Sequence, residues 1–509
     1  MNRRSPIGRL SCAAGALLFS FICAAATADD RAAGVRRVTS MEALALAEAH
    51  HPGLRASRLE MERARESVRA AEGLNPFFFG ADAGFTHSST PQGNSLYYRR
   101  DEVSLGAGVW KTFNVGTRAD LRLEGAFYET GRPPTATAVD PGNVPNLGLS
   151  GRLTLTQPLI RGAGKTVTLA ALRQARAEQT LAEKAADVAA GELAASVLHT
   201  YWDLWLAERA LDINRRSRDE ALHQLEEIRE RVAMGAAAAV DRISYETALA
   251  GLEETVIESE AEVRRLETGL AEQVGLTRTT ARLGADPQEL PSMRDNVPTA
   301  EALEKEALER SPAIHEAFAA LAAAKERALT AGESMRHQLD LQGWIEGRTL
   351  ARDEVAPVFT DFGRGAAWSA YVGLHYELPL DRRKREGDRA VARIDVKIAA
   401  ERLDGVSNQV CAAVRAARDR LDSARQRLEK GKETVALSQS RMEAEQERYR
   451  LGVSTFTSVR DAEETVRQAE LRMTRAQVDV VRAWIELDLL TGVLTENLWQ
   501  SPTSSAIPE

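Results

Sequence analysis

The sequence predicts a mainly helical protein with β regions, built from two copies of one strand-plus-long-helix unit. Three landmarks occur twice, in the same order: Pro52 and Pro312, then Pro158 and Pro379, then Gly235 and Gly452. After the second landmark of each copy, a helical pattern continues without a breaker over residues 166–232 and 389–451. Helices of that length would extend on the order of 95–100 Å. Because ordinary globular helices are much shorter, these helices need neighbours that support them along their length.

The first residues have the pattern of a cleaved secretory signal. Residues 1–9 carry three arginines and no acidic residue, residues 10–25 form an apolar run, and Ala26-Thr27-Ala28 follows. A basic start, a short apolar core and an A-x-A site are typical of signal peptides. A membrane anchor would need roughly 20 apolar residues. We therefore expect residues 1–28 to be a signal peptide.

Composition narrows the possibilities for the remaining chain. Only Cys411 remains after residue 28, so we expect packing, without an internal disulfide, to stabilise the protein. The net charge of −8 over 509 residues is mild and argues against a nucleic-acid partner. An aromatic content of 5%, with abundant Ala, Arg and Glu, is typical of long helices packed closely side by side. No continuous apolar stretch after residue 28 is long enough for a transmembrane helix.

The first repeat is expected to cover residues 29–290. Its elements are, in chain order, helices over 40–73, a β region over 77–158 and a helical hairpin over 166–275. Thr39 and Glu42 have the spacing of a capping box at the start of the first helix, and Pro52 divides the helical region in two. Alternation at period two predicts four strands, over 77–85, 103–113, 119–128 and 147–155.

The second repeat is expected to cover residues 291–495, followed by a C-terminal tail over 496–509. Its elements are helices over 299–333, a β region over 338–379 and a helical hairpin over 389–491. Ser311 is a good N-cap before Pro312 at the first position of a helix. The β region is shorter than in the first repeat, so the additional pair over 103–128 could either lengthen a loop or add strands.

Both long helices end at a glycine, Gly235 or Gly452, and a new helical pattern begins a few residues later. Glycine after a long helix is a C-cap signal, which predicts the tips of two helical hairpins. The return helices, over about 240–274 and 458–490, are roughly half as long as the outbound helices. We therefore expect the helices that follow the repeated X-Pro openings to continue them coaxially and to complete a rod four helices wide.

This ordered set of motifs, present twice, resembles the TolC family of outer membrane efflux proteins over nearly all of the chain after residue 28. The resemblance is carried by the Glu-Ala-Leu…Pro openings, by Leu155-Thr-Gln-Pro-Leu159 and by Arg448-Tyr449-Arg-Leu-Gly452-Val-Ser-Thr-Phe456. It implies a passive homotrimeric conduit in the cell outer membrane. Each protomer would give strands to one shared β-barrel and its long helices to one periplasmic α-helical barrel, so that no sheet edge stays open in lipid.

The same resemblance implies the partners of the channel. They would be a periplasmic adaptor protein, an inner-membrane transporter that supplies the energy, and outer-membrane lipid; neither a nucleic acid nor a cofactor is implied. In this family the tip glycines bind the hairpin tips of the adaptor, which places adaptor contacts at Gly235, Gly452, Met234, Ala236, Leu451 and Val453. Glycine permits a close backbone approach, although both glycines could equally serve only as helix caps.

The family also closes the periplasmic end of its tunnel with polar side chains near the tips, and the matching residues are Asp241, Tyr449 and Asp461. Three copies of each acid would form carboxylate rings. Ser454 stands where the family often has an arginine that helps close this gate, and Ser458 replaces another aspartate. Arg242 or Arg460 could take over the missing arginine's role. The alternative is a packed tyrosine with solvated acids.

No motif in the sequence predicts an enzyme. The sequence has no G-x-x-x-x-G-K-S/T, H-E-x-x-H or G-x-S-x-G pattern. Residues 162–165, Gly-Ala-Gly-Lys, lack the spacing of a phosphate loop and suit a hinge. A soluble periplasmic coiled-coil scaffold or adaptor is the alternative function, which explains the long hairpins but not the alternating strands. The sequence does not identify the pump or the cargo, because drugs, metal ions and polypeptides pass through similar conduits.

Overall fold

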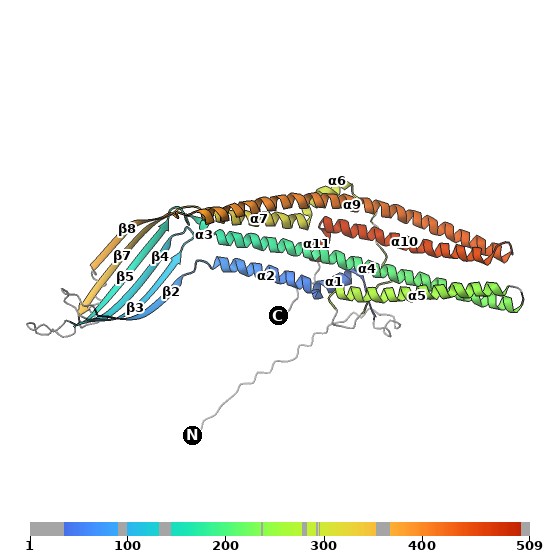
Figure 1. The fold of residues 1–509 in the computed structure, drawn as a ribbon, viewed down its shortest axis with the longest axis horizontal. Coiled ribbons are helices and arrows are strands. Elements are labelled where there is room, and N and C mark those ends of the chain that lie inside the picture. The colour runs from blue at the N-terminus through green and yellow to red at the C-terminus, as the bar shows by residue number, and fades with distance from the viewer. Residues whose placement is uncertain are drawn as a thin grey trace, which may run out of the picture.

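The structure is a computed structural model, and it describes residues 35–89, 99–131, 144–235, 238–276, 282–291, 294, 296–352 and 367–499. The molecule is elongated, with a β-sheet at one end and long helices that run from it to two hairpin tips at the other end (Figure 1). The predicted signal peptide, Ala236 and residues 500–509 of the predicted tail lie outside the described residues.

The two halves of the chain contribute similar elements in a similar order. The first half contains β1 (Val35–Val38), α1 (Ser40–His50), α2 (Pro52–Glu72), β2 (Phe78–Ser89), β3 (Arg99–Thr112), β4 (Arg118–Gly131), β5 (Val144–Pro158), α3 (Lys165–Thr168), α4 (Ala170–Ala233), α5 (Ala239–Gln273) and β6 (Arg282–Ala285). The second contains α6 (Ala300–Arg310), α7 (Pro312–Glu333), β7 (Gln338–Arg352), β8 (Ala367–Glu377), α9 (Arg383–Arg450), α10 (Phe456–Leu490) and α11 (Val493–Trp499).

Six strands form one antiparallel sheet in the order β2-β3-β4-β5-β7-β8. The two halves of the chain meet at the β5–β7 pair, where Arg152 lies opposite Glu346 and its Nε donates to that carboxylate at 2.8 Å. β3 and β4 lie between β2 and β5, so the additional segment over 103–128 adds strands to the sheet. The edges of this sheet are β2 and β8.

The two faces of the sheet have opposite chemistry, because successive side chains of a strand point to opposite sides. One face exposes a set of large apolar side chains: Phe79, Phe85, Leu105, Leu121, Leu123, Ile345, Val372 and Leu374. The other face carries ion pairs, including Arg122 with Asp82 at 2.9 Å and Arg152 with Glu346. The Arg122–Asp82 pair passes over Gly106 of β3, where an added Cβ would lie 2.8 Å from the Asp82 carboxylate.

The helices form an open row of four columns (Figure 1). α2 and α5 both contact α4, α4 contacts α7 and α10, and α7 and α10 both contact α9. In Figure 1, α2 continues the line of α5, and α7 continues the line of α10. This arrangement confirms the predicted rod four helices wide, with the α2/α5 column at one edge of the row and α9 at the other.

Each two-helix column is joined at a glycine that packs against an X-Pro opening. Gly275, after α5, has a φ of +87°, and an added Cβ would lie 2.7 Å from the carbonyl oxygen of His50. Gly492, after α10, has a φ of +80°, and an added Cβ would lie 2.6 Å from the carbonyl oxygen of Arg310. Both positions therefore require glycine, for its positive φ and for the close approach of another backbone.

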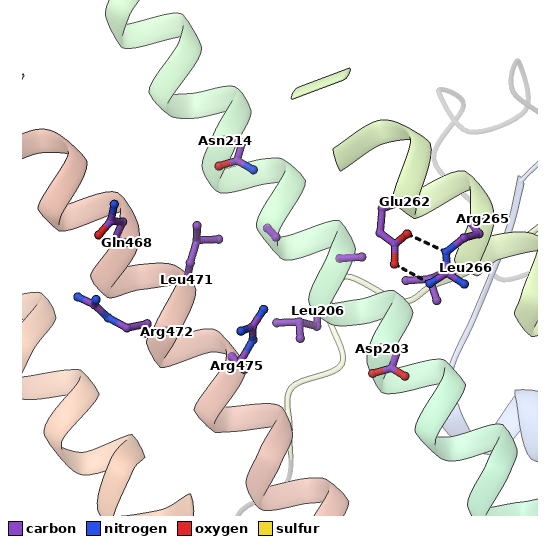
Figure 2. A pocket seen from close by; sticks show the side chains of 12 residues that line it. Asp203, Leu206, Asn214, Glu262, Arg265, Leu266, Gln468, Leu471, Arg472 and Arg475 are labelled. Carbon is purple, nitrogen blue, oxygen red and sulfur yellow. Dashed lines mark hydrogen bonds and ion pairs between the residues drawn. The ribbon is translucent and has the colours of Figure 1, made fainter. Parts of the chain in front are cut away.

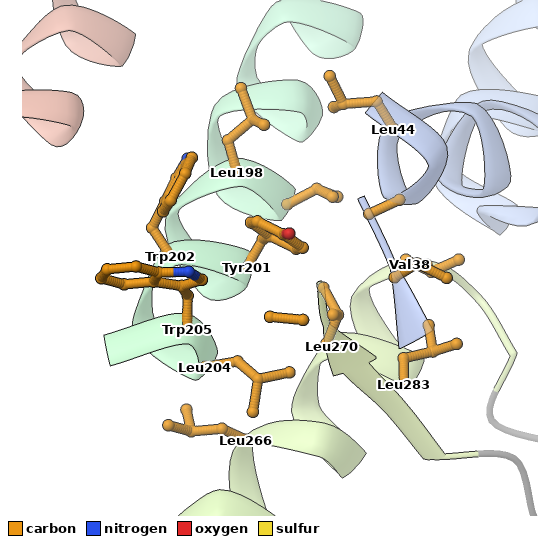
Figure 3. Close-up of a cluster of buried hydrophobic side chains, with 14 of the residues drawn as sticks. Val38, Leu44, Leu198, Tyr201, Trp202, Leu204, Trp205, Leu266, Leu270 and Leu283 are labelled. Atoms are coloured by element: carbon orange, nitrogen blue, oxygen red, sulfur yellow. The ribbon is translucent and has the colours of Figure 1, made fainter. Parts of the chain in front are cut away.

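A cluster of buried apolar side chains lies around the middle of α4 (Figure 3). β1 and β6 pair in parallel, and they pack with α1 against α4 and α5 through Val38, Leu44, Leu198, Tyr201, Trp205, Leu270 and Leu283. The Tyr201 hydroxyl donates to the Glu289 carboxylate at 2.5 Å, and Trp205 Nε1 donates to the Glu289 carbonyl at 2.9 Å. We call five short elements the waist elements: β1, β6, α1, α6 and α11. The sequence did not predict three of them, namely β1, β6 and α11.

Several predicted boundaries are wrong. α9 begins at Arg383 and not at residue 389, because Asp381 accepts a hydrogen bond from the Arg383 N–H at 2.9 Å and starts the helix earlier. The first long helix is interrupted at Leu169, where a ψ of 13° separates α3 from α4. α11 extends to Trp499, so the predicted tail begins inside a helix.

The two predicted caps have different outcomes. The capping box of Thr39 and Glu42 is confirmed, with both of its hydrogen bonds present. Ser311 precedes Pro312 at the start of α7 as predicted, but its side chain makes no cap hydrogen bond.

Candidate functional site at the hairpin tips

The tip of the second hairpin is a complete Schellman turn. Gly452 has a φ of +76°, its N–H donates to the Tyr449 carbonyl at 3.0 Å, and the Val453 N–H donates to the Arg448 carbonyl at 2.9 Å. These two bonds satisfy carbonyls that the end of α9 would otherwise leave without a partner. Thr455 then begins α10 by accepting a hydrogen bond from the Ser458 N–H at 3.3 Å.

The tip of the first hairpin repeats this geometry at Gly235. Its φ is +74°, and its N–H donates to the Val232 carbonyl at 3.0 Å. An added Cβ on Gly235 or on Gly452 would meet no atom within 4 Å. The tip glycines thus face open space, which distinguishes them from the packed Gly275 and Gly492. Their positive φ requires glycine, and the space beside them is free for another backbone.

Apolar side chains beside the tip glycines are exposed. Met234 is 74% exposed in the first tip, and Leu451 and Val453 are 70% and 65% exposed in the second. Ala236, the remaining predicted member of this set, lies outside the described residues. Gly235 and Gly452 share a positive φ, but the exposed side chains described beside them differ: methionine beside Gly235, leucine and valine beside Gly452.

An aromatic cluster behind the tips joins the two hairpins. The rings of Tyr245 on α5 and Phe456 on α10 lie 3.5 Å apart between centroids, and Leu225 and Ile228 of α4 complete the buried set. Tyr449 is partly buried against this cluster. Burial raises the pKa of the Tyr245 phenol, and the neighbouring Tyr449 phenol raises it further.

A carboxylate connects the second tip to its own helix. Glu445 of α9 accepts hydrogen bonds from the Ser454 hydroxyl and from Arg448 Nη1, both at 2.7 Å. The hydrogen bond from Ser454, together with the Arg448 charge, holds the pKa of the Glu445 carboxyl below its usual value. Ser454, which stands where an arginine was expected, therefore fixes the tip to α9 within one chain.

The second half of the chain also carries a family pattern. Residues 303–493 match the family model described as outer membrane efflux protein. This half of the chain is therefore similar to outer membrane efflux proteins. Its match includes α7, both strands β7 and β8, and the whole hairpin of α9 and α10.

The chain shares its fold with solved outer membrane proteins over most of both chains. The outer membrane protein VceC from Vibrio cholerae aligns with a TM-score of 0.61 and 17% identity, covering 89% of this chain and 96% of VceC. The outer membrane channel CmeC from Campylobacter jejuni aligns with a TM-score of 0.62 and 12% identity, covering 89% and 85%. The open state of the MtrE channel from Neisseria gonorrhoeae aligns with a TM-score of 0.58 and 16% identity, covering 89% and 88%. No curated protein matches the chain by sequence.

The predicted gate residues make contacts within their own chain. Asp241 accepts a hydrogen bond from the Ala238 N–H at 3.3 Å at the start of α5, and Asp461 pairs with its neighbour Arg460 at 3.1 Å. Asp461 also lines a groove between the two hairpins, and Tyr245 and Phe456 line the same groove. These contacts agree with local roles for the acids, so the gate function of Asp241, Tyr449 and Asp461 stays a prediction.

A second carboxylate, Glu463 of α10, joins the two hairpins and was not predicted. It accepts a hydrogen bond from Gln224 of α4 at 2.7 Å and another from Gln446 of α9 at 3.2 Å. Burial raises the pKa of the Glu463 carboxyl, the two amide donors oppose that rise, and the nearby Glu220 adds to it. In sequence this residue looks like any other acid on a charged helix.

Within the described ranges, no group of three or more His, Cys, Asp or Glu side chains is arranged to hold a metal ion. No helix in the described part of the chain combines the length and apolar character that a membrane span requires.

Proposed function

We propose that the chain is one protomer of a homotrimeric outer-membrane export channel, a passive conduit that binds a periplasmic adaptor and works with an inner-membrane transporter. The observation that carries this proposal is that both layers of the molecule are open. Among the described residues, no further strand pairs with the outer edges of β2 and β8, and the helix row ends at the α2/α5 column and at α9. Open layers of this kind call for further copies at both edges.

The sheet has the two faces that a lipid-embedded barrel wall needs. Its apolar face exposes Phe79, Phe85 and Ile345 at 72%, 69% and 60%, which suits contact with lipid tails. Its ion-paired face suits an aqueous interior. Six strands from each of three copies would form one ring of eighteen (three times six) and would pair every edge.

The helices at the edges of the row carry exposed apolar side chains, which favour burial in a contact with another protomer. On α9, Val391, Ile394 and Leu437 are exposed, and on α2 Leu59 is exposed. Contact between the α9 edge of one protomer and the α2/α5 edge of the next would bury such residues and close the row into a tunnel. The same three-fold closure thus satisfies the sheet and the helices.

The hairpin tips support the proposed adaptor contact. Gly235 and Gly452 leave open space beside the backbone, and exposed Met234, Leu451 and Val453 surround them. Apolar side chains that are exposed together commonly mark a protein-protein contact. Three protomers would present six tips, alternating between the methionine type and the leucine-valine type.

The proposed function is tested with Gly452→Trp in a cell that also expresses a periplasmic adaptor with a helical hairpin. We expect wild type to appear in the outer-membrane fraction as a heat-modifiable trimer and to copurify with the adaptor. Gly452→Trp should keep the trimer and lose the adaptor, because the indole fills the space beside the tip. Gly452→Ala is the matched control, because alanine must adopt the same positive φ as tryptophan but adds little volume.

The two parts of this experiment have separate negative outcomes. Wild-type protein that stays in the soluble periplasmic fraction would contradict the channel and favour a scaffold. Equal adaptor recovery with wild type and Gly452→Trp would contradict docking at the tips while leaving the channel in place.

A further inference from the structure

A groove of about 660 Å³ lies between α4, α5 and α10, and it extends from the level of the waist elements toward the tips. Figure 2 shows Arg472 and Arg475 on α10, Asp203 and Asn214 on α4, and Glu262 on α5 around it. It is unrelated to the predicted tip and gate residues.

Helix geometry places this groove on the face of the row opposite the waist elements. On α4, Tyr201 and Trp205 bond to Glu289, and Glu208 pairs with Arg37 of β1. Residues two positions apart on a helix project about 200° apart. The groove residues Asp203, Ala207 and Ala210 each stand two positions from one of those waist contacts, so they project from the opposite side.

The same geometry holds on α10. Asp488 pairs with Arg294, in the segment that leads to α6, at 2.7 Å. Arg475 and Arg472 precede Asp488 by 13 and 16 positions, which corresponds to rotations of about 220° and 160°. Both arginines therefore project from the face that the waist elements leave uncovered.

Two polar contacts between α4 and α10 frame the groove. Toward the tips, Arg467 Nη1 donates to Asn214 Oδ1 at 2.9 Å. Toward the sheet, Arg482 pairs with Asp203. These contacts hold the two helices in place on either side of Arg472 and Arg475.

The positive charges of the groove exceed its free negative charges. Asp203 is already paired with Arg482, and Glu262 accepts hydrogen bonds from Arg265 at 2.7 and 2.6 Å. Arg472 and Arg475 are exposed, and among the described residues neither has a carboxylate within ion-pair distance. The groove thus presents two guanidinium groups without a counterion.

These two arginines stay uncovered in the proposed trimer. α10 lies inside the row, between α4 and α9, while neighbouring protomers meet at the α2/α5 and α9 edges. When the row closes, the bulky waist elements must lie outside, because inside they would fill the tunnel. The groove then faces the interior, and three copies bring six free guanidinium groups to one level of the tunnel wall.

We propose that Arg472 and Arg475 form a binding site for anionic cargo, groups such as carboxylates, phosphates or sulfonates, on the tunnel wall. Its placement inside the tunnel rests on the proposed function. Guanidinium groups match such anions with planar, paired donors. Because both side chains are solvated, binding should be weak and sensitive to salt, which lets cargo leave as readily as it enters.

The test uses purified full-length protein in detergent and pyrene-1,3,6,8-tetrasulfonate as the probe, with binding followed by fluorescence anisotropy at low salt. We expect Arg472→Gln/Arg475→Gln to raise the Kd about tenfold, since two charge-assisted contacts are lost. Arg472→Lys/Arg475→Lys should retain most of the affinity. Arg36→Gln/Arg282→Gln, which removes two exposed arginines of the waist sheet, is the matched control and should leave the Kd unchanged.

Unchanged probe affinity in Arg472→Gln/Arg475→Gln would overturn the anion site, and so would an equal loss in the waist control, which would indicate only a net-charge effect. Bilayer conductance of the same wild-type preparation tests the conduit separately. A protein that conducts but binds no probe at these arginines contradicts the site alone. A protein that binds the probe there but never conducts supports the site and contradicts the channel.

Discussion

One half-buried carboxylate links three helices from both hairpins. Glu463 on α10 accepts hydrogen bonds from Gln224 on α4 and Gln446 on α9. Its neighbour Glu464 is paired with Arg467 at 2.6 Å. Burial raises the pKa of Glu463, whereas the hydrogen bonds from Arg467 and Gln468 outweigh burial and lower the pKa of Glu464. Adjacent acids in one helix are therefore expected to affect stability in opposite directions.

We expect Glu463→Gln to raise the thermal unfolding midpoint near pH 8 by roughly 1–2 °C. The folded pKa of Glu463 lies above its unfolded value, so its stabilising contribution is complete below the unfolded pKa and is lost as pH rises through the folded pKa. The neutral glutamine keeps an acceptor for Gln224 and avoids that loss. Circular dichroism melts from about pH 4 to pH 8 should show the difference growing with pH.

Glu464→Gln is the control with the opposite sign. The folded pKa of Glu464 is lowered, so its charge stabilises the protein above the unfolded pKa, and the variant should melt below wild type near pH 8. If Glu463→Gln lowers the unfolding midpoint near pH 8 as much as Glu464→Gln does, the prediction is wrong. The charge of Glu463 would then stabilise the contact between the hairpins.

At the residue scale, the sequence was informative where a backbone conformation demanded one residue type. Gly235 and Gly452 were predicted as caps because a long helical pattern stops there, and both have the expected positive φ. Glu463 and Arg472 could not be predicted in the same way. They are charged residues on helices rich in charge, and their surroundings depend on which helix lies opposite.

At the scale of elements, the joints between stacked helices explain the repeated X-Pro openings. Gly275 follows Gly235 by 40 positions (275 − 235), and Gly492 follows Gly452 by the same 40 (492 − 452). Each of these later glycines packs against the carbonyl before or near the opening proline of its own half. The duplicated unit therefore includes the joint as well as the hairpin.

We expect Gly492→Ala to destabilise the protein by about 2–4 kcal/mol. The alanine would adopt a φ of +80° and place its Cβ 2.6 Å from the Arg310 carbonyl oxygen, which adds a clash to the conformational cost. Gly452→Ala has a nearly equal φ but no atom within 4 Å of its Cβ, so it should cost only about 1–2 kcal/mol. Denaturant unfolding measures both, and equal losses would refute the role of packing at the joint.

Helical periodicity predicted the long elements well, and the errors lie where local contacts set the ends. The early start of α9 depends on the hydrogen bond from the Arg383 N–H to Asp381, and the break at Leu169 lies in the turn from sheet to rod. β1 and β6 are four residues each and pair across a distance of more than two hundred positions, so neither carries a pattern of its own.

At the scale of the whole molecule, the four-column row was predictable because half-length return helices need coaxial partners. The position of the additional strands β3 and β4 could not be predicted, because alternation of apolar and polar residues identifies a strand but not its neighbours. The structure places β3 and β4 inside the sheet, which gives each protomer six strands between the edges β2 and β8. The central claim is that three copies close these edges into one ring.

Disulfide cross-linking between the two edges tests this closure most directly. In a Cys411→Ser background, Ala81→Cys on β2 is combined in turn with Trp368→Cys, Ala370→Cys, Val372→Cys and Leu374→Cys, which lie on the same sheet face of β8. For the pair in register, oxidation in outer membranes should give dimer and trimer bands on non-reducing gels and no larger species. Monomer alone at every pairing, or a ladder that continues beyond the trimer, would contradict a closed ring of three.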